Sequence, residues 1–105
     1  MIAGLDARLD ELAAQKQVTT YGALAADLGL DGPGRIARLT TALEAMMEQD
    51  TATGRPLRAA LVVGRTSGGL PARGFFDKAR ALGHDTRHPE AFHRHHLNGC
   101  FARAS

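Results

Sequence analysis

Between residues 19 and 43 the chain reads TTYGALAADLGLDGPGRIARLTTAL. Thr20 offers a capping hydroxyl before an alanine-rich run, and Gly29 follows that run, so we predict a short helix of two to three turns here. The next residues, Gly32-Pro33-Gly34, are typical of a turn in which the proline opens another helix. This stretch therefore predicts two helices joined by a glycine-bearing turn.

Helices are also expected on both sides of this turn. Apolar residues recur at helical spacing from about residue 2 to residue 16, which predicts a first helix with one buried stripe. After the turn, a longer helix is expected from residue 35 to about residue 49. Its predicted buried positions are Ile36, Leu39, Leu43, Met46 and Met47.

The period of the pattern changes after Pro56. Residues 57–64 are short, β-branched near their end and bounded by proline and glycine, which predicts a strand. We expect residues 65–69 to form a hairpin loop and residues 70–73 to return as a short edge strand. Two further helices are expected, from residue 75 to 82 and from residue 89 to 101.

Length and composition indicate one globular domain. The 105 residues are 44% hydrophobic and 23% charged, which excludes a large multidomain enzyme and a disordered chain. We expect a single domain over residues 1–105, with a core at 2–83 and a C-terminal helical extension at 84–105. One cysteine cannot form an internal disulfide, and no apolar run is long enough for a bilayer, so the expected location is the cytoplasm.

Charge is unevenly spread along the chain. The first 53 residues carry four basic and eight acidic side chains, whereas residues 54–105 carry nine basic and three acidic ones. An excess of positive charge in one half indicates an anionic partner for that half.

The order of the predicted elements is that of a winged helix-turn-helix domain, mostly α with a small β-hairpin. In addition, residues 20–25, TYGALA, resemble the Thr-Tyr-Gly-x-hydrophobic-Ala signature of the alkylguanine-DNA alkyltransferase and alkyltransferase-like group. Residues 55–63, RPLRAALVV, lie where that group has its Pro-x-His-Arg-Val-Val strand, and the likeness covers about residues 18–83. Small bacterial proteins also contain a run similar to residues 55–63, and this second resemblance implies no activity.

The resemblance implies DNA binding without dealkylation. A nucleophilic cysteine would stand beside the strand's proline, but this position is Leu57 and no histidine follows it. Cys100 lies far downstream, and no base is placed beside it by the sequence. We therefore expect no catalytic activity.

Three polar residues share a face at the start of the predicted helix 35–49. Arg35, Arg38 and Thr41 are three residues apart, and a helix in a DNA groove would turn them toward bases or phosphates. Arg65 in the hairpin loop and Arg73 beyond it would add positive charge on the same side. We predict that these five residues bind double-stranded DNA, although a solvated helix face is the alternative for the first three.

A second function remains open from the sequence. The acidic first half and the small net charge also suit a winged-helix-like module for protein–protein interaction or dimerisation, which would use the long helix or the C-terminal helices. A weaker possibility is an enzyme centred on the histidines.

The histidine-rich C-terminal segment raises the question of a metal. His93, His96 and Cys100 could face one zinc ion from a helix, but no further cysteine or carboxylate completes a known spacing. The alternative is a stripe packed on the core, and we expect no metal and no cofactor. Glu44, Glu48 and Asp50 are expected to be solvated. The histidines of this segment are His84, His88, His93, His95 and His96.

Overall fold

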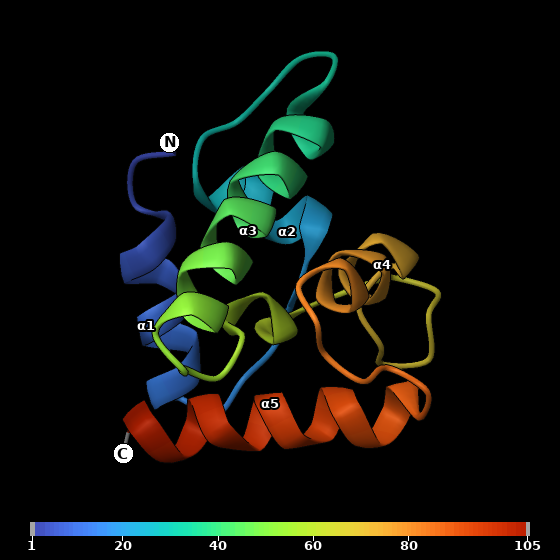
Figure 1. The fold of residues 1–105 in the computed structure, drawn as a ribbon. Coiled ribbons are helices and arrows are strands. Elements are labelled where there is room, and N and C mark those ends of the chain that lie inside the picture. The colour runs from blue at the N-terminus through green and yellow to red at the C-terminus, as the bar shows by residue number, and fades with distance from the viewer. Residues whose placement is uncertain (1, 105) are drawn as a thin grey trace.

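The computed structural model describes residues 2–104 and confirms a mostly helical fold with a small β element (Figure 1). The helices are α1 (Leu5–Ala14), α2 (Tyr21–Asp27), α3 (Arg35–Ala52), α4 (Arg73–Ala81) and α5 (Pro89–Ala104). A 3-10 helix, η1 (Arg58–Leu61), and two short strands, β1 (Thr19–Thr20) and β2 (Val62–Val63), complete the described elements. No helix within residues 2–104 has the length and apolar character needed to cross a membrane.

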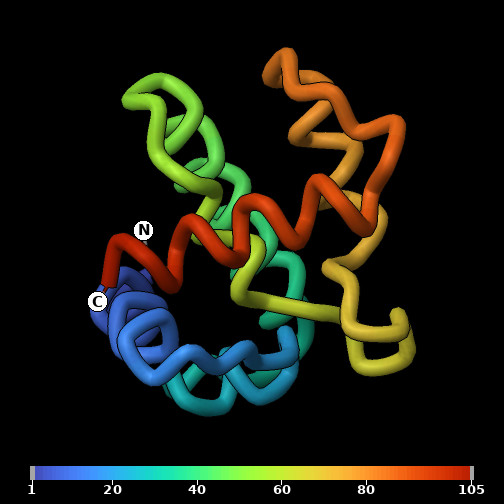
Figure 2. The backbone as a smooth tube through the Cα atoms, turned by 90° about the horizontal axis from the view of Figure 1, so that it is seen from below, coloured from blue at the N-terminus to red at the C-terminus, as the bar shows by residue number. Residues whose placement is uncertain are grey.

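The short helix η1 lies at the centre of the molecule and packs against α1, α3 and α5. In Figure 1, α5 runs along the base while α1 and α4 lie on opposite sides of α3. Seen from below in Figure 2, α5 crosses the molecule from the α1 side to the α4 side. Burial of apolar side chains from all of these elements supplies the main stabilising free energy.

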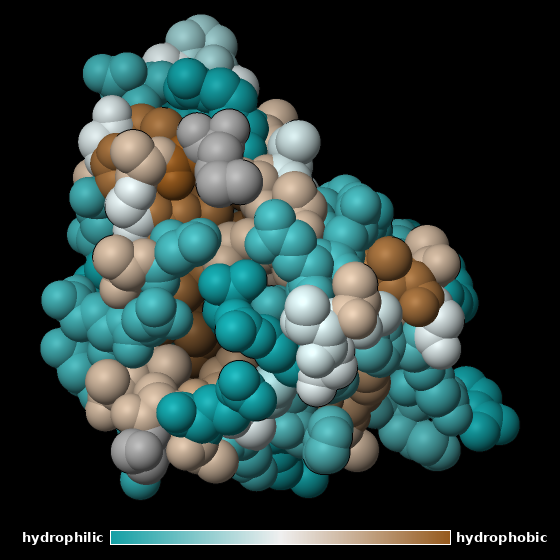
Figure 3. Space-filling view, turned by 60° about the vertical axis from the view of Figure 1, so that its left-hand side comes forward, coloured by the Kyte–Doolittle hydropathy of each residue, from teal (hydrophilic) through white to brown (hydrophobic). Residues whose placement is uncertain are grey.

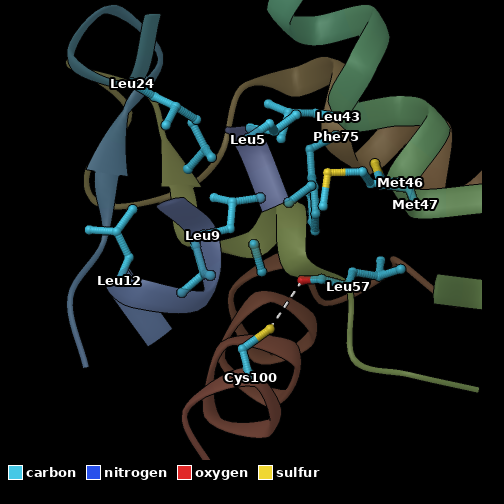
Figure 4. Close-up of a cluster of buried hydrophobic side chains, with 14 of the residues drawn as sticks. Leu5, Leu9, Leu12, Leu24, Leu43, Met46, Met47, Leu57, Phe75 and Cys100 are labelled. Atoms are coloured by element: carbon cyan, nitrogen blue, oxygen red, sulfur yellow. Dashed lines mark hydrogen bonds between the residues drawn. The ribbon is translucent and has the colours of Figure 1, made fainter. Parts of the chain in front are cut away.

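The core gathers leucine, methionine and phenylalanine side chains from elements far apart in the sequence (Figure 4). The leucines of α1 recur at helical spacing and point inward, so the predicted stripe is confirmed. The segment predicted as an extension after residue 83 contributes α5, whose Cys100 belongs to this core. The leucines that are less than 2% exposed are Leu5, Leu9, Leu24, Leu39, Leu57 and Leu61.

The two helices predicted around the glycine-bearing turn are confirmed, but α3 begins at Arg35, so the prediction that Pro33 opens this helix was wrong. The Thr20 hydroxyl accepts a hydrogen bond from the Ala23 backbone N–H at 3.2 Å and so caps α2. Gly34 precedes α3 with a φ of 78°, a left-handed conformation that favours glycine. However, Ile36 is 38% exposed, so its predicted burial was wrong. Leu39, three residues later, faces the core instead.

The predicted antiparallel hairpin was wrong. Residues 58–61 form η1, and the strand is limited to β2, which pairs in parallel with β1 in the register Thr19 to Val62. The returning strand at residues 70–73 is absent, and Arg73 begins α4. Arginine and alanine are weaker strand formers than the β-branched pairs Thr19–Thr20 and Val62–Val63, and Pro71 has no N–H for a ladder.

A buried ion pair fastens α3 to η1. Asp50 is 0% exposed, so the prediction that it is solvated was wrong. Its carboxylate accepts hydrogen bonds from the Arg58 backbone N–H at 3.0 Å and from the Arg58 guanidinium at 3.0–3.1 Å. The inward position of Asp50 is stabilised because each carboxylate oxygen has a charged or N–H partner.

Candidate nucleic-acid interface

Two of the predicted site residues border one depression. Arg35, the first residue of α3, and Arg65, which follows β2, line a hollow of about 560 Å³. Its remaining wall is formed by Thr20, Tyr21, Gly22, Ala23 and Ile36. Thirty positions apart in the sequence, the two arginines thus face a common surface.

The parallel strand pair explains why Arg65 reaches this place. β1 leads directly into Tyr21, and β2 is followed after one glycine by Arg65. Because parallel strands run in the same direction, the residues that follow each strand emerge at the same edge. The loop after β2 is closed by a hydrogen bond from the Gly64 N–H to the Leu70 carbonyl at 2.8 Å.

Tyr21 connects this depression to the start of α4. Its phenolic oxygen accepts a hydrogen bond from the Ala72 N–H at 3.0 Å, and burial raises the pKa of Tyr21. Arg73 is the next residue after Ala72 and is 94% exposed, with a 4.0 Å contact to Asp77. The backbone that carries Arg73 therefore lies at the edge of the wall formed by Tyr21.

Among residues 2–104, the guanidinium groups at the depression share the lack of a carboxylate partner with Arg38, Arg55, Arg94 and Arg103, and they differ from the ion-paired arginines. Within residues 2–104, no ion pair joins Arg35 or Arg65 to a carboxylate. Their charges are available to an external anion. Arginines that are paired with aspartate or glutamate at 3.2 Å or less are Arg8, Arg58, Arg80 and Arg87.

The other two predicted residues, Arg38 and Thr41, border a different hollow. They line a groove of about 810 Å³ between α3, the start of α1 and the turn after α2. The guanidinium of Arg38 donates to the Asp31 carbonyl at 2.8 Å. Figure 3 shows apolar surface on the side where α1 and α3 meet. The predicted row on α3 is thus divided between a basic depression and an apolar groove.

The histidine-rich segment is directed toward backbone atoms. His93 and His96 are hydrogen-bonded to Ala60 and Leu57, and the Cys100 thiol donates to the Leu57 carbonyl at 3.5 Å. Burial raises the pKa of Cys100 to about 11, which removes thiolate character near neutral pH. Among the described residues, no group of three histidine, cysteine or acidic side chains has the geometry of a metal site.

Tyr21 is the residue of this surface that the sequence reasoning did not select. It appears in the quoted Tyr-Gly segment, but an aromatic residue at the start of a helix carries no positional signal of its own. Its contact with Ala72, 51 positions away, depends on the tertiary fold.

Comparison with models of protein families, with curated proteins and with solved structures gave no match to this chain. Function is therefore inferred from the geometry of the molecule itself.

Proposed function

We propose that this protein binds the phosphate backbone of double-stranded DNA through the face formed by Arg35, Arg65 and Arg73 around Tyr21. The observation that carries this proposal is the depression that Arg35 and Arg65 border without carboxylate partners within residues 2–104. Phosphate contacts from arginine supply most of the affinity of non-specific DNA binding.

Two further observations support this function. Arg65 and Arg73 belong to residues 54–105, which carry nine basic and three acidic side chains. The positive charge at this face therefore agrees with the positive charge of that half of the chain. The depression is also lined by Thr20 to Ala23, within the segment that resembles the alkyltransferase group. In this proposal, Tyr21 positions Arg73 through its bond to Ala72.

The direct test is fluorescence anisotropy with a labelled duplex of about 20 base pairs. Arg35→Ala combined with Arg65→Ala should weaken binding at least about tenfold at low salt, because two phosphate contacts are lost. The logarithm of affinity should also fall less steeply with the logarithm of salt concentration, by about two in slope.

A matched control removes the same charge elsewhere. Arg55 and Arg103 are exposed, border a separate hollow with Asp10, and form no ion pair within the described residues. Replacing both by alanine should change the affinity less than about threefold. Equal losses in the two double variants would show diffuse electrostatic attraction in place of a defined face. Absence of binding at low salt would exclude the proposal.

A second candidate function is association with a protein, and the apolar groove along α3 favours it. Its walls are largely leucine, isoleucine, methionine and alanine, a composition suited to an apolar partner surface. Analytical ultracentrifugation tests self-association. If the groove forms a dimer, Ala45→Glu within it should shift the chain toward the monomer, whereas the DNA-binding face should be unaffected.

A further inference from the structure

We propose that His96 makes the attachment of α5 to η1 sensitive to pH, so that acidification below neutrality loosens α5 from the rest of the molecule. His96 is 8% exposed, and its Nδ1 accepts a hydrogen bond from the Leu57 backbone N–H at 3.0 Å. A ring nitrogen can accept only when it carries no proton, so this bond requires neutral His96 with its proton on Nε2.

The attachment of α5 is formed by three polar side chains on one helical face. His93 Nε2 lies 2.8 Å from the Ala60 carbonyl and donates to it, and the Cys100 thiol donates to the Leu57 carbonyl (Figure 4). Residues at spacings of three and four fall on the same face of a helix. Both backbone groups of Leu57, just before η1, are therefore held by α5.

Protonation affects these histidines differently. His93 acts as a donor, so its bond to Ala60 persists when the ring gains a second proton. His84 Nε2 lies 2.9 Å from the Thr51 hydroxyl, which can either donate or accept. In contrast, a second proton on His96 points an N–H at the Leu57 N–H and removes the bond.

Titratable groups on neighbouring elements also act on the protonation of His96, and most of them oppose it. His84, in the segment after α4, lies with its ring centroid 5.4 Å from that of His96, and His95 on α5 lies at 5.3 Å. Positive charge on either ring, or on His93, opposes protonation of His96. Asp50 on α3 favours it, but Arg58 on η1 is paired with that carboxylate.

The sign of the pH effect follows from the environment of the ring. Burial, and to a smaller extent the neighbouring histidines, lower the pKa of His96 to about 4. A histidine whose pKa is lower in the folded state than in the open state stabilises the folded state above the ordinary value of about 6.5. This contribution is lost progressively as the pH falls from about 6.5 toward 4.

Close packing next to His96 explains why loss of its hydrogen bond to Leu57 should weaken the other contacts of α5. Gly99 lies against Pro56, and a Cβ at Gly99 would come within 2.8 Å of the proline ring. Because α5 approaches the chain before η1 so closely, its contacts form and separate together. Opening of this contact would expose Cys100, which is buried in the closed state.

Hydrogen exchange measured by mass spectrometry tests the proposal on the full chain. After correction for the intrinsic exchange rate, protection of the α5 amides in the parent should fall about 20-fold between pH 7 and pH 5. His96→Asn keeps an acceptor oxygen near the position of Nδ1 but cannot be protonated, so its protection should fall less than threefold. His88→Asn, at an exposed histidine, is the control and should behave like the parent.

Either of two hydrogen-exchange results would overturn the proposal. One is protection in the parent that stays constant down to pH 5, and the other is an equal loss in parent and His96→Asn. If that variant does not fold, an NMR titration of the parent decides the question: His96 must titrate well below 6 while α5 amide protection declines. A ring that titrates above 6 without loss of protection would also contradict the proposal.

Discussion

Replacement of Asp50 by alanine should be among the most damaging single substitutions in this chain. The change removes an acceptor for the Arg58 backbone N–H at 3.0 Å and for two nitrogens of its guanidinium at 3.0 and 3.1 Å. Loss of one partner from a buried ion pair costs about 3–5 kcal/mol. Since the Arg58 side chain remains 18% exposed and lies 4.0 Å from Asp6, partial solvation places the expected cost near the lower limit, about 3 kcal/mol.

Urea unfolding followed by far-ultraviolet circular dichroism measures this cost. The matched control is Glu48→Ala, two residues earlier on α3, which breaks an exposed ion pair to Lys78 and should cost less than about 1 kcal/mol. Similar losses in the two variants would refute the reasoning that burial, and not ion pairing as such, makes Asp50 important. Asp50→Asn should fall between them, because one carbonyl oxygen can still accept from the Arg58 N–H.

Three further substitutions, the first with a matched control, test the packing and the helix ends by thermal and chemical unfolding. Gly99→Ala should destabilise the fold by about 1 kcal/mol, although alanine favours a helix, because the new Cβ would clash with the rigid ring of Pro56. The control is Gly74→Ala in α4. This position has open space around it, so the substitution should be neutral or stabilising. Leu39→Ala should cost about 2–5 kcal/mol through the cavity that it leaves at a fully buried position. Thr20→Ala should cost about 1 kcal/mol because the Ala23 N–H loses its capping acceptor.

Local patterns predicted the helices well because the signals that start and stop a helix are close in sequence. Thr20 as a cap, the glycine turn before α3 and the leucine spacing of α1 all depend on interactions within a few residues. The end of α3 was predicted less accurately, at about residue 49 instead of Ala52, because contacts with η1 and α4 stabilise its last turns. The predicted burial of Ile36 was wrong because a helix near the surface can expose one apolar residue at little cost in free energy.

The sequence could not reveal contacts between distant segments. The burial of Asp50 depends on Arg58 reaching back from the next element, and a carboxylate on a helix is ordinarily solvated. Similarly, a run of valines predicts a strand but does not specify its partner. Thr19 and Val62 are 43 positions apart, and nothing in the local pattern distinguishes this parallel pairing from a hairpin with the next segment.

With the parallel pair in place of the predicted hairpin, Arg35, Arg65 and Arg73 still belong to the proposed DNA-binding face, whereas Arg38 and Thr41 line another groove. Because β1 and β2 run in parallel, Arg65 after β2 lines the same hollow as Arg35 at the start of α3. Arg73 stands at the first position of α4, next to Ala72, whose N–H donates to Tyr21, and the proposed function uses this bond to position Arg73. Tyr21→Phe should therefore weaken DNA binding only through Arg73, and it should add little to the loss caused by Arg73→Ala, because both changes act on the same contact.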